Sequence, residues 1–565
     1  MKNLFFIFLM LVYSKGFCQV IDTYQKYKDY QNQNLNRIIE LQKKESKNDA
    51  DRFAIIEYYE NSSEILENLL SQDSPQSAEI TKELLDNYTY CMRAYPDKKD
   101  SVKIIEYYNR AKTLGLCKPE HIVFRIELSN SDIFPYIKND FCVKNSWDDN
   151  SFSTPFKEDI SDQEKTAGLS KLWSEAKYNF VYFDQVPDLN WDSLYFAFIP
   201  KVLATSSTKE YYDILKIFYS KLEDSHSGVF YPDQLNIGRP PLRCRMIENK
   251  VLVSNVLNDS LASIGIKKGL EVVKINGLPV MDYANKYVIP YISSSTKQDL
   301  LVRTYKYELF AGNRTEMLQI GMIDSKGKYH EYTISRKLPY NIHSKNDKTI
   351  DFKLLDNNIG YLAINSFSGK KPVIKEFDKI FNQILPTEGL IIDIRNNGGG
   401  NSGNGDYIFS CFIDKPANKW SSQTLDYRPA ERVWRTGIPS WYQYEKSLLN
   451  PNKIKYYSKQ VVILINANTF SAAEDFCILF DINQRAEIIG QPTAGSTGQP
   501  LLFNLPGGGW ARVCTLRSYY PDGNEFVGYG IQPDIYINET ISDFQNDKDI
   551  VLIKAEEYMK KKIKE

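Results

Sequence analysis

Histidine and regularly spaced cysteine are scarce in this sequence. Only four histidines occur among 565 residues, and they are too scattered for the paired spacing of metal ligands: His121, His226, His330 and His343. We therefore predict no metal site. No Cys-x-x-Cys motif occurs, and the seven cysteines after Cys18 are irregularly spaced. An odd number leaves at least one thiol without a partner inside the chain.

An excess of either charge is also missing. The sequence holds 70 Lys+Arg against 71 Asp+Glu, which excludes binding of nucleic acid or an anionic membrane by bulk electrostatics. Beyond the first 20 residues no apolar run is long enough to cross a bilayer, so we predict no membrane span. Aromatic residues, by contrast, are abundant, with 39 Tyr and 29 Phe, and this argues against a disordered chain.

One short apolar run stands near the beginning. Residues 4–13 (LFFIFLMLVY) follow Lys2, which is the pattern of a secretory signal peptide. We expect a signal over residues 1–19 and an exported protein, periplasmic or secreted. A lipid anchor at Cys18 is the alternative. It fits less well because lipoprotein processing prefers a small residue before the cysteine, and Phe17 stands there.

Helical periodicity dominates the first part of the chain. Apolar residues at helical spacing predict an all-α N-terminal region over 20–150 and a helical lobe over 155–237. Ser161 and Glu164 fit a capping box at the start of the second stretch. The string IIEYY occurs twice, at 55–59 and 104–108, and hints at repeated helical hairpins.

The pattern then changes from helices to strands. Short strands and Gly turns predict a small β domain over 238–340. From residue 350, continuous apolar strands alternate with helices, as at 359–364, 390–394 and 461–465. Strands that are apolar on both faces indicate a parallel α/β core, which we place over 350–545. A C-terminal helix is expected over 546–565.

Two segments at the ends of predicted strands contain residues that could take part in catalysis. Residues 393–400 (DIRNNGGG) follow one buried strand, and Gly398 and Gly399 could expose N–H groups there. Ser471 lies between another buried strand and a helix. Taken alone, Ser471 is more simply explained as an N-cap and the glycines as a flexible loop. A nucleophile at this position would gain from the helix N-terminus and from the N–H of Ala472. The motif is not the G-x-S-x-G elbow of α/β-hydrolases.

Several strings, in this order, give the sequence a family resemblance: LEDSHSGV (222–229), GYLAINSF (360–367), DIRNNGGG (393–400), TFSAAE (469–474), GQPTAGSTG (490–498) and GYGIQPDI (528–535). Together with residues 251–280, which look PDZ-like, they resemble the C-terminal processing peptidase and tricorn protease family of serine peptidases, and its tricorn-core-like branch above all. The resemblance covers roughly residues 165 to 545.

The resemblance implies a fold and a reaction. The fold would be a ClpP/crotonase-like α/β core with a helical lobe and an inserted PDZ-like domain. The reaction would be hydrolysis of peptide bonds in peptides or unfolded proteins through an acyl-enzyme, without a cofactor. Ser471 falls on the nucleophile, His226 on the base and Ser225 on the serine that orients the base. The oxyanion donors would be the N–H groups of Ala472 and of Gly398 or Gly399.

The chain departs from the family pattern at two places. Branches with a Ser–Lys pair carry Lys at the position of Ser496, so a Ser–Lys dyad is not expected. The usual acidic residue after the PDZ-like glycine is absent, because Leu270 follows Gly269. In tricorn-type peptidases a glutamate supports the base, and its position in this sequence aligns with Glu525 or, in the other possible register, with Val527. Glu474 is expected to be structural.

Two other functions stay open at this stage. The chain could be an inactive relative that binds a peptide or another ligand, although it retains Ser471, His226 and Ser225 together. Alternatively, the helical N-terminal region could be a scaffold or glycan-binding module. If His226 is the base, a free imidazole with a pKa of about 6.5 predicts that activity falls as the pH drops through roughly 6–7. The sequence leaves the oligomeric state open.

Overall fold

The chain divides into two compact units, Met1–Asp149 and Asn150–Glu565, which are described separately. The computed structural model describes scattered positions over 25–41 and residues 49–70, 77–94, 101–117, 137, 152–341, 348–368, 373–434, 440–445 and 448–565. The predicted signal peptide over 1–19 and Cys18 lie outside these residues. Within the described ranges, no helix has the length and apolar character needed to cross a bilayer.

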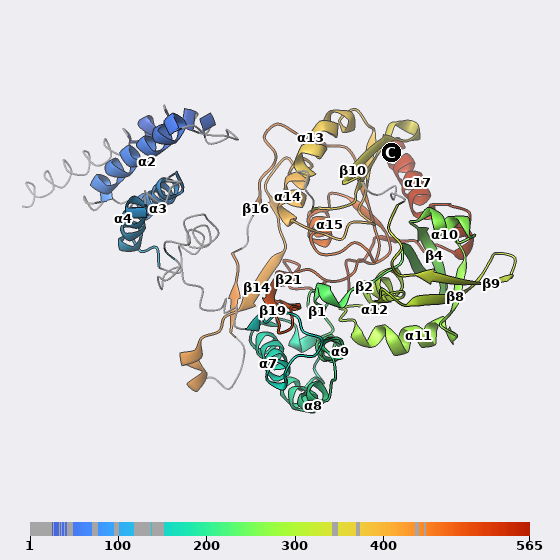
Figure 1. Cartoon of the computed structure of the whole chain (residues 1–565). Helices are drawn as coiled ribbons and strands as arrows, with labels where there is room; N and C mark the ends of the chain where they lie inside the picture. The colour runs from blue at the N-terminus through green and yellow to red at the C-terminus, as the bar shows by residue number, and fades with distance from the viewer. Residues whose placement is uncertain are drawn as a thin grey trace, which may run out of the picture. The chain divides into compact units, whose positions relative to one another are not determined.

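The described part of the first unit is helical, as the periodicity predicts (Figure 1). Its helices are α2 (Asp49–Leu70), α3 (Ser77–Ala94) and α4 (Ser101–Thr113). In α3, Ile80, Leu84 and Tyr88 recur at helical spacing and are buried. The two IIEYY strings lie in α2 and α4, and each buries its tyrosines in the core of this unit. Cys117 is disulfide-bonded.

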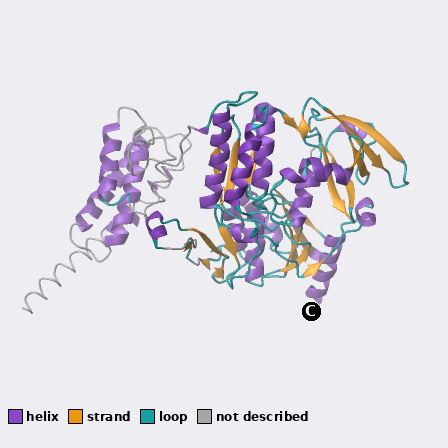
Figure 2. Cartoon of the chain, turned by 90° about the horizontal axis from the view of Figure 1, so that it is seen from below, coloured by secondary structure: helices purple, strands orange, loops and turns teal. Residues whose placement is uncertain are grey.

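The second unit is built on a six-stranded sheet (Figures 1 and 2). Its order is β10-β11-β12-β17-β18-β22, with only β10 antiparallel to its neighbour. The strands are β10 (Ile350–Leu354), β11 (Ile359–Ile364), β12 (Gly389–Asp393), β17 (Val461–Ile465), β18 (Glu487–Gly490) and β22 (Ile535–Tyr536). Every residue of β12 and β17 is buried, which is why both are continuous apolar runs.

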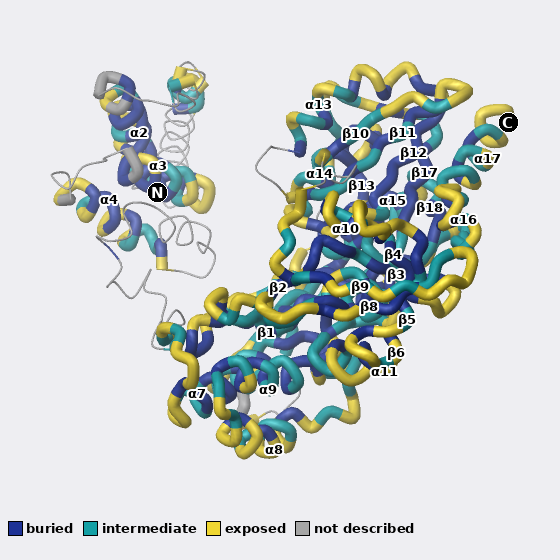
Figure 3. Tube along the Cα trace, turned by 45° about the vertical axis from the view of Figure 1, so that its right-hand side comes forward, coloured by how far each residue is buried: buried dark blue, intermediate teal, exposed yellow. Residues whose placement is uncertain are grey.

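Alternate residues of these strands face two different helical layers. Leu390, Ile392 and Ile463 pack with α13 (Val373–Ile384), α14 (Ser402–Ser410) and α15 (Ala472–Ile482). Ile391, Val462 and Leu464 pack instead against Val551, Ala555 and Met559 of α17 (Ile550–Lys564). Figure 3 shows the central strands buried between these layers. The predicted C-terminal helix is therefore one layer of the α/β core.

A helical lobe precedes the sheet in the chain. It consists of α7 (Asp162–Asn179), α8 (Trp191–Leu203) and α9 (Thr208–Ser220), and the predicted capping box of Ser161 and Glu164 is present at the start of α7. The lobe shares the main hydrophobic core of the unit. After α9 the chain turns into β1 (Gly228–Phe230), which pairs with β20 (Trp510–Cys514). This pairing fixes the turn that carries His226.

A separate β domain is inserted between the lobe and the sheet (green in Figure 1). Its strand order is β3-β4-β5-β8-β9, and its own core lies beneath α11 (Val280–Tyr287). These strands are β3 (Leu242–Ile247), β4 (Lys250–Val256), β5 (Glu271–Ile275), β8 (Met317–Ile323) and β9 (Tyr329–Ser335). The predicted turn at Asn276-Gly277 follows β5, and both residues have positive φ, as a tight hairpin requires.

Candidate active site

The two predicted motifs meet at one edge of the sheet. Strands β12 and β17 are parallel neighbours, so the glycine loop 398–400 and Ser471 both follow carboxyl ends of strands. Ligands and active sites of open α/β sheets lie at this edge. A Cβ added to Gly399 would lie 2.8 Å from Cβ of Ser471 and 2.7 Å from the carbonyl oxygen of Phe470. The loop can therefore approach the serine this closely only with glycine.

Ser471 has an unusual backbone conformation at the start of α15. Its φ is 58° and its ψ is −126°, a region that non-glycine residues adopt only when their surroundings impose it. The surroundings here are specific: the N–H of Ser471 donates to the carbonyl of Ser496 at 3.1 Å and to Oε2 of Glu474 at 3.2 Å. The conformation presents the hydroxyl to His226.

His226 reaches the serine from the turn between α9 and β1. Its Nε2 lies 3.0 Å from Oγ of Ser471, and its Nδ1 lies 2.7 Å from Oγ of Ser496. The imidazole stacks on Phe470, with ring centroids 4.6 Å apart and planes within 9°. Burial lowers the pKa of His226 well below its ordinary value, and the nearby cations Arg512 and Arg303 lower it further.

Ser496 is held in place by a buried carboxyl group. Glu474 accepts hydrogen bonds from Thr493 Oγ1 at 2.5 Å, from the N–H of Gly495 at 2.8 Å and from the N–H of Ser496 at 3.0 Å. Burial raises the pKa of Glu474 to about 8, and the hydrogen bonds from Thr493, Ser496 and Gly495 oppose this rise. Glu474 therefore fixes the loop that presents Ser496, in keeping with a structural role.

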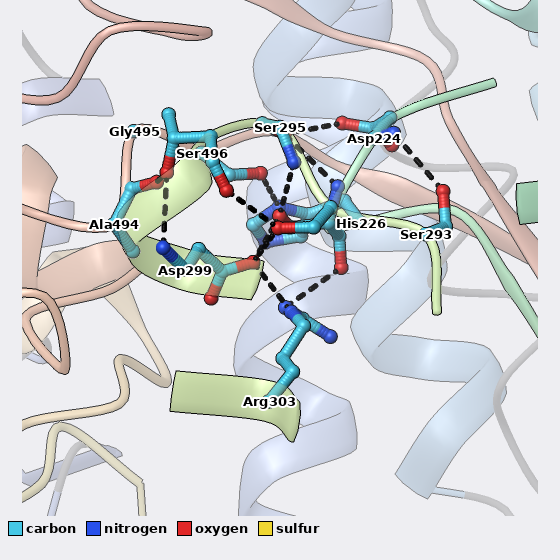
Figure 4. Close-up of polar contacts among 12 residues, drawn as sticks. Asp224, His226, Ser293, Ser295, Asp299, Arg303, Ala494, Gly495 and Ser496 are labelled. Atoms are coloured by element: carbon cyan, nitrogen blue, oxygen red, sulfur yellow. Dashed lines mark hydrogen bonds and ion pairs between the residues drawn. The ribbon is translucent and has the colours of Figure 1, made fainter. Parts of the chain in front are cut away.

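Ser225 does not bond to His226. Its hydroxyl donates to Oδ2 of Asp299 at 2.5 Å and accepts from the N–H of Ser295 at 2.8 Å. Asp299 also bonds to Arg303, as Figure 4 shows. The expectation that Ser225 orients the base is therefore corrected, because its single proton is directed at Asp299. Ser225 instead anchors the His226 turn to α12 (Lys297–Val302) of the inserted domain.

Glu525 is not brought to the site. Its carboxylate bonds to Arg517 at 2.7 Å from Nε, and the same guanidinium binds Asp184. Glu525 thus belongs to a salt-bridge network between β21 (Arg517–Tyr519) and the helical lobe. The expectation that it supports the base is corrected, because Arg517 engages it there. Val527 is buried and apolar, and its carbonyl accepts a hydrogen bond from the side chain of Gln185.

Two of the predicted oxyanion donors, Gly398 and Gly399, line one cavity together with Ser471. This cavity has a volume of about 430 Å³, and its lining includes His226, Ser471 and Gly398 to Gly400. The N–H of Gly399 already donates to Oδ1 of Asn397 at 2.9 Å. In the described part of the chain, the N–H groups of Gly398 and Ala472 have no hydrogen-bond acceptor. These two are therefore the donors available to an oxyanion.

The sequence patterns missed several residues of this arrangement. Ser496 could have been found, because it stands where Ser–Lys peptidases carry their lysine and a hydroxyl is a good partner for imidazole. Asp299 and Arg303 gave no signal, since they come from the inserted domain and lie 74 and 78 residues from Ser225 in the chain. Among the described residues, no cluster of three or more His, Cys, Asp or Glu could hold a metal ion.

Comparison with protein families and curated proteins gives one consistent result. Residues 358–537 match the model of peptidase family S41. The chain is 24% identical over 227 residues to the carboxy-terminal-processing protease of Bartonella bacilliformis, covering 37% of this chain and 49% of that protein. It is 25% identical over 189 residues to the carboxyl-terminal-processing protease of Synechocystis sp., covering 33% and 40%. The chain thus spans less than half the length of these relatives.

A solved structure extends the likeness beyond the matched segment. The crystal structure of mature CPAF superposes with a TM-score of 0.57 at 16% sequence identity, covering 71% of this chain and 97% of that chain. At this identity the likeness concerns the fold alone. The likeness confirms the predicted mixed α/β fold class.

Proposed function

Since residues 358–537 belong to peptidase family S41, we propose that the protein is a serine endopeptidase with Ser471 as nucleophile and His226 as general base. The observation that carries this proposal is the hydrogen bond of 3.0 Å between Oγ of Ser471 and Nε2 of His226, beside two N–H groups without acceptors. The substrates would be peptides or unfolded segments of proteins, because a scissile bond must enter the cavity at the sheet edge in an extended form.

The geometry supports the following reaction. Ser471 Oγ attacks the carbonyl carbon of the peptide bond while Nε2 of His226 takes its proton. The oxyanion that forms accepts hydrogen bonds from the N–H groups of Gly398 and Ala472. His226 then protonates the leaving amine, which departs and leaves an acyl-enzyme. A water molecule that is deprotonated by the same nitrogen hydrolyses the ester and frees Ser471.

Ser496 supplies the orientation that this reaction requires. A neutral imidazole carries one proton, and it must reside on Nδ1 if Nε2 is to accept from Ser471. In that tautomer the hydroxyl oxygen of Ser496, 2.7 Å from Nδ1, accepts the Nδ1–H and holds the ring in the reactive orientation. Because a hydroxyl is neutral, it stabilises the imidazolium less than a carboxylate would, so we expect a modest turnover number.

The test uses the full-length protein and two variants. Wild type should react with a fluorophosphonate probe and cleave a denatured protein, whereas Ser471→Ala should do neither and should melt within a few degrees of wild type. His226→Ala should likewise lose turnover. If Ser471→Ala cleaves as fast as wild type, the assignment is wrong. If wild type neither reacts nor cleaves, the protein is the binding relative rather than the enzyme.

Export is part of the same proposal and rests on Lys2 and the apolar run over 4–13. Processing near Cys18 or Gln19 would release the mature chain outside the cytoplasm. Fractionation of cells with N-terminal sequencing of the mature protein tests this. Recovery of the chain in the cytoplasm with residues 1–19 intact would exclude export, and a lipid on Cys18 would support the anchored alternative.

A further inference from the structure

A second, larger cavity lies on the other side of the His226 turn. Its volume is about 570 Å³, and its walls come from the end of α9, from β1 and β20, and from the helical turn Arg303–Glu308 of the inserted domain. Ser225 and Ser227, the two neighbours of His226, both line it. Arg512 lines this cavity and also the cavity that contains Ser471. The two cavities therefore adjoin at one side chain.

The walls of the larger cavity are strongly basic. Only two carboxylates line it, those of Asp233 and Glu308. The five cations that line it are Lys216, Arg239, Arg303, Arg314 and Arg512. Arg239 is paired with Glu308, and Arg303 with Asp299. Among the described residues, no carboxylate lies within ion-pair distance of the other three cations, Lys216, Arg314 and Arg512. The cavity therefore holds positive charge that the described part of the chain leaves unneutralised.

Arg512 is the most constrained of the unpaired cations. One of its N–H groups donates to the carbonyl of Ser225 at 3.1 Å, but its Nε is buried and has no hydrogen-bond partner within the described residues. Burial lowers the pKa of Arg512, and the charge of the neighbouring Arg303 lowers it further. The negative charge of Asp224 acts against this lowering. A desolvated, unpaired guanidinium is unfavourable, and a bound anion would relieve that cost.

Lys216 is another lining cation without an ion-pair partner among the described residues. Its ammonium group lies over the ring of Tyr231, 4.6 Å from the centroid, and makes no hydrogen bond within the described residues. Burial lowers its pKa, and the charges of Glu308 and Asp213 act against that effect. Apolar side chains complete the cavity, including Phe230 and Trp510, whose rings stack 3.9 Å apart. Cations above apolar walls suit a carboxylate on a peptide better than a free inorganic anion.

We propose that this cavity is a substrate subsite that binds a carboxylate of the peptide whose scissile bond lies at Ser471. The proposal rests on the proposed peptidase function. Guanidinium and ammonium groups recognise carboxylates through charge-assisted hydrogen bonds, and Arg512 links the subsite to the reacting centre. The carboxylate has two possible sources, an acidic side chain or the C-terminal end of the peptide chain.

Binding to the full-length Ser471→Ala protein tests the subsite without turnover. The probes are fluorescein-labelled decapeptides of Ala, Leu and Ser that carry one Glu at each position in turn, with Gln counterparts, each made with a free and an amidated C-terminus. We expect at least one position, or the free C-terminus, to bind tenfold more tightly than its neutral counterpart. Adding Lys216→Met or Arg314→Gln should reduce this preference at least fivefold.

A matched control separates the subsite from general charge. Lys250→Met makes the same change at an exposed lysine on β4 that is paired with Glu271 and does not line the cavity, so it should leave the preference intact. A Glu-dependent preference identifies an acidic side chain as the source, and dependence on the free carboxylate identifies the chain end. Equal binding of all charged and neutral peptides overturns the proposal.

Parallel cleavage assays with wild type distinguish the two proposals. If the charged peptides bind preferentially through Lys216 and Arg314 but wild type cleaves none of them, the subsite stands and the peptidase assignment fails. If wild type cleaves charged and neutral peptides at equal kcat/KM and binding shows no preference, the peptidase assignment stands and the subsite is excluded.

Discussion

Ser496 Oγ lies 2.7 Å from Nδ1 of His226, in the position where Ser–Lys peptidases carry a lysine. A hydroxyl thus stands in place of the missing lysine, and in the proposed mechanism it orients His226 rather than acting as the base. Figure 4 shows Ser496 and Gly495 beside His226, with Asp299 and Arg303 below the turn. The arrangement joins the loop after β18 to the turn after α9, and this junction exists only in the folded protein.

Removal of this hydroxyl should affect catalysis rather than substrate binding. We expect Ser496→Ala to lower kcat about tenfold with little change in KM, because the imidazole loses the partner that holds its orientation. A tenfold loss corresponds to about 1.4 kcal/mol of transition-state stabilisation. Steady-state kinetics on one peptide measures both constants. Glu525→Gln is the control: its carboxylate bonds Arg517, so kcat should stay within twofold of wild type. A tenfold loss in the control instead would restore Glu525 to the site.

Glu474→Gln should destabilise the fold as well as slow the reaction. The four groups that surround the carboxyl all donate: Thr493 Oγ1 and the N–H groups of Ser471, Gly495 and Ser496. An amide would place its own N–H₂ group against two of them, and each buried donor left unpaired costs about 1–3 kcal/mol. Denaturant unfolding should show a loss of about 2 kcal/mol or more. Unchanged stability would mean that the loop has another anchor.

The acid-side fall of activity in the pH profile should occur at an unusually low pH. Because burial, Arg512 and Arg303 lower the pKa of His226 below 6.5, the base stays neutral at pH values where a free imidazole is protonated. We therefore expect the fall in kcat/KM to occur at lower pH than the range of roughly 6–7 that an unperturbed histidine would give.

A variant and a stability control accompany this profile. Arg512→Gln removes one of the cations that lower the pKa, so its acid limb should move to higher pH. The unfolded chain binds a proton that folded His226 resists, so stability also declines as the pH falls below about 6.5. Tryptophan fluorescence at each pH shows whether the protein is still folded. A limb that does not move in Arg512→Gln would argue against the electrostatic effect of that residue.

The adjacent glycines Gly398 and Gly399 should respond differently to replacement by alanine. A Cβ on Gly399 would collide with Phe470 and Ser471, and its φ of 94° disfavours other residues, so Gly399→Ala should reduce kcat/KM at least a hundredfold. A Cβ on Gly398 meets nothing within 4 Å, and alanine keeps the N–H, which has no acceptor among the described residues. Gly398→Ala should therefore retain most activity. Equal losses in the two variants would contradict this description of the loop.

Much of the fold follows from local pattern. Strands β12 and β17 are apolar at every position because helical layers cover both of their faces, and this periodicity is visible without the structure. The same logic brings Ser471 and the glycine loop together, since carboxyl ends of neighbouring parallel strands share an edge. The capping box at Ser161 is likewise local, and it occurs as predicted.

Only the tertiary structure decided which residues support the proposed catalytic groups. Ser225 lies next to His226 in sequence, yet its hydroxyl turns to Asp299, while the imidazole bonds to Ser496, 270 residues away. Glu525 is polar and close to the last family motif, but Arg517 engages it. Sequence determined which residues could donate or accept a proton. Which of them do so depends on orientation and on competing partners, and these arise only when distant segments pack together.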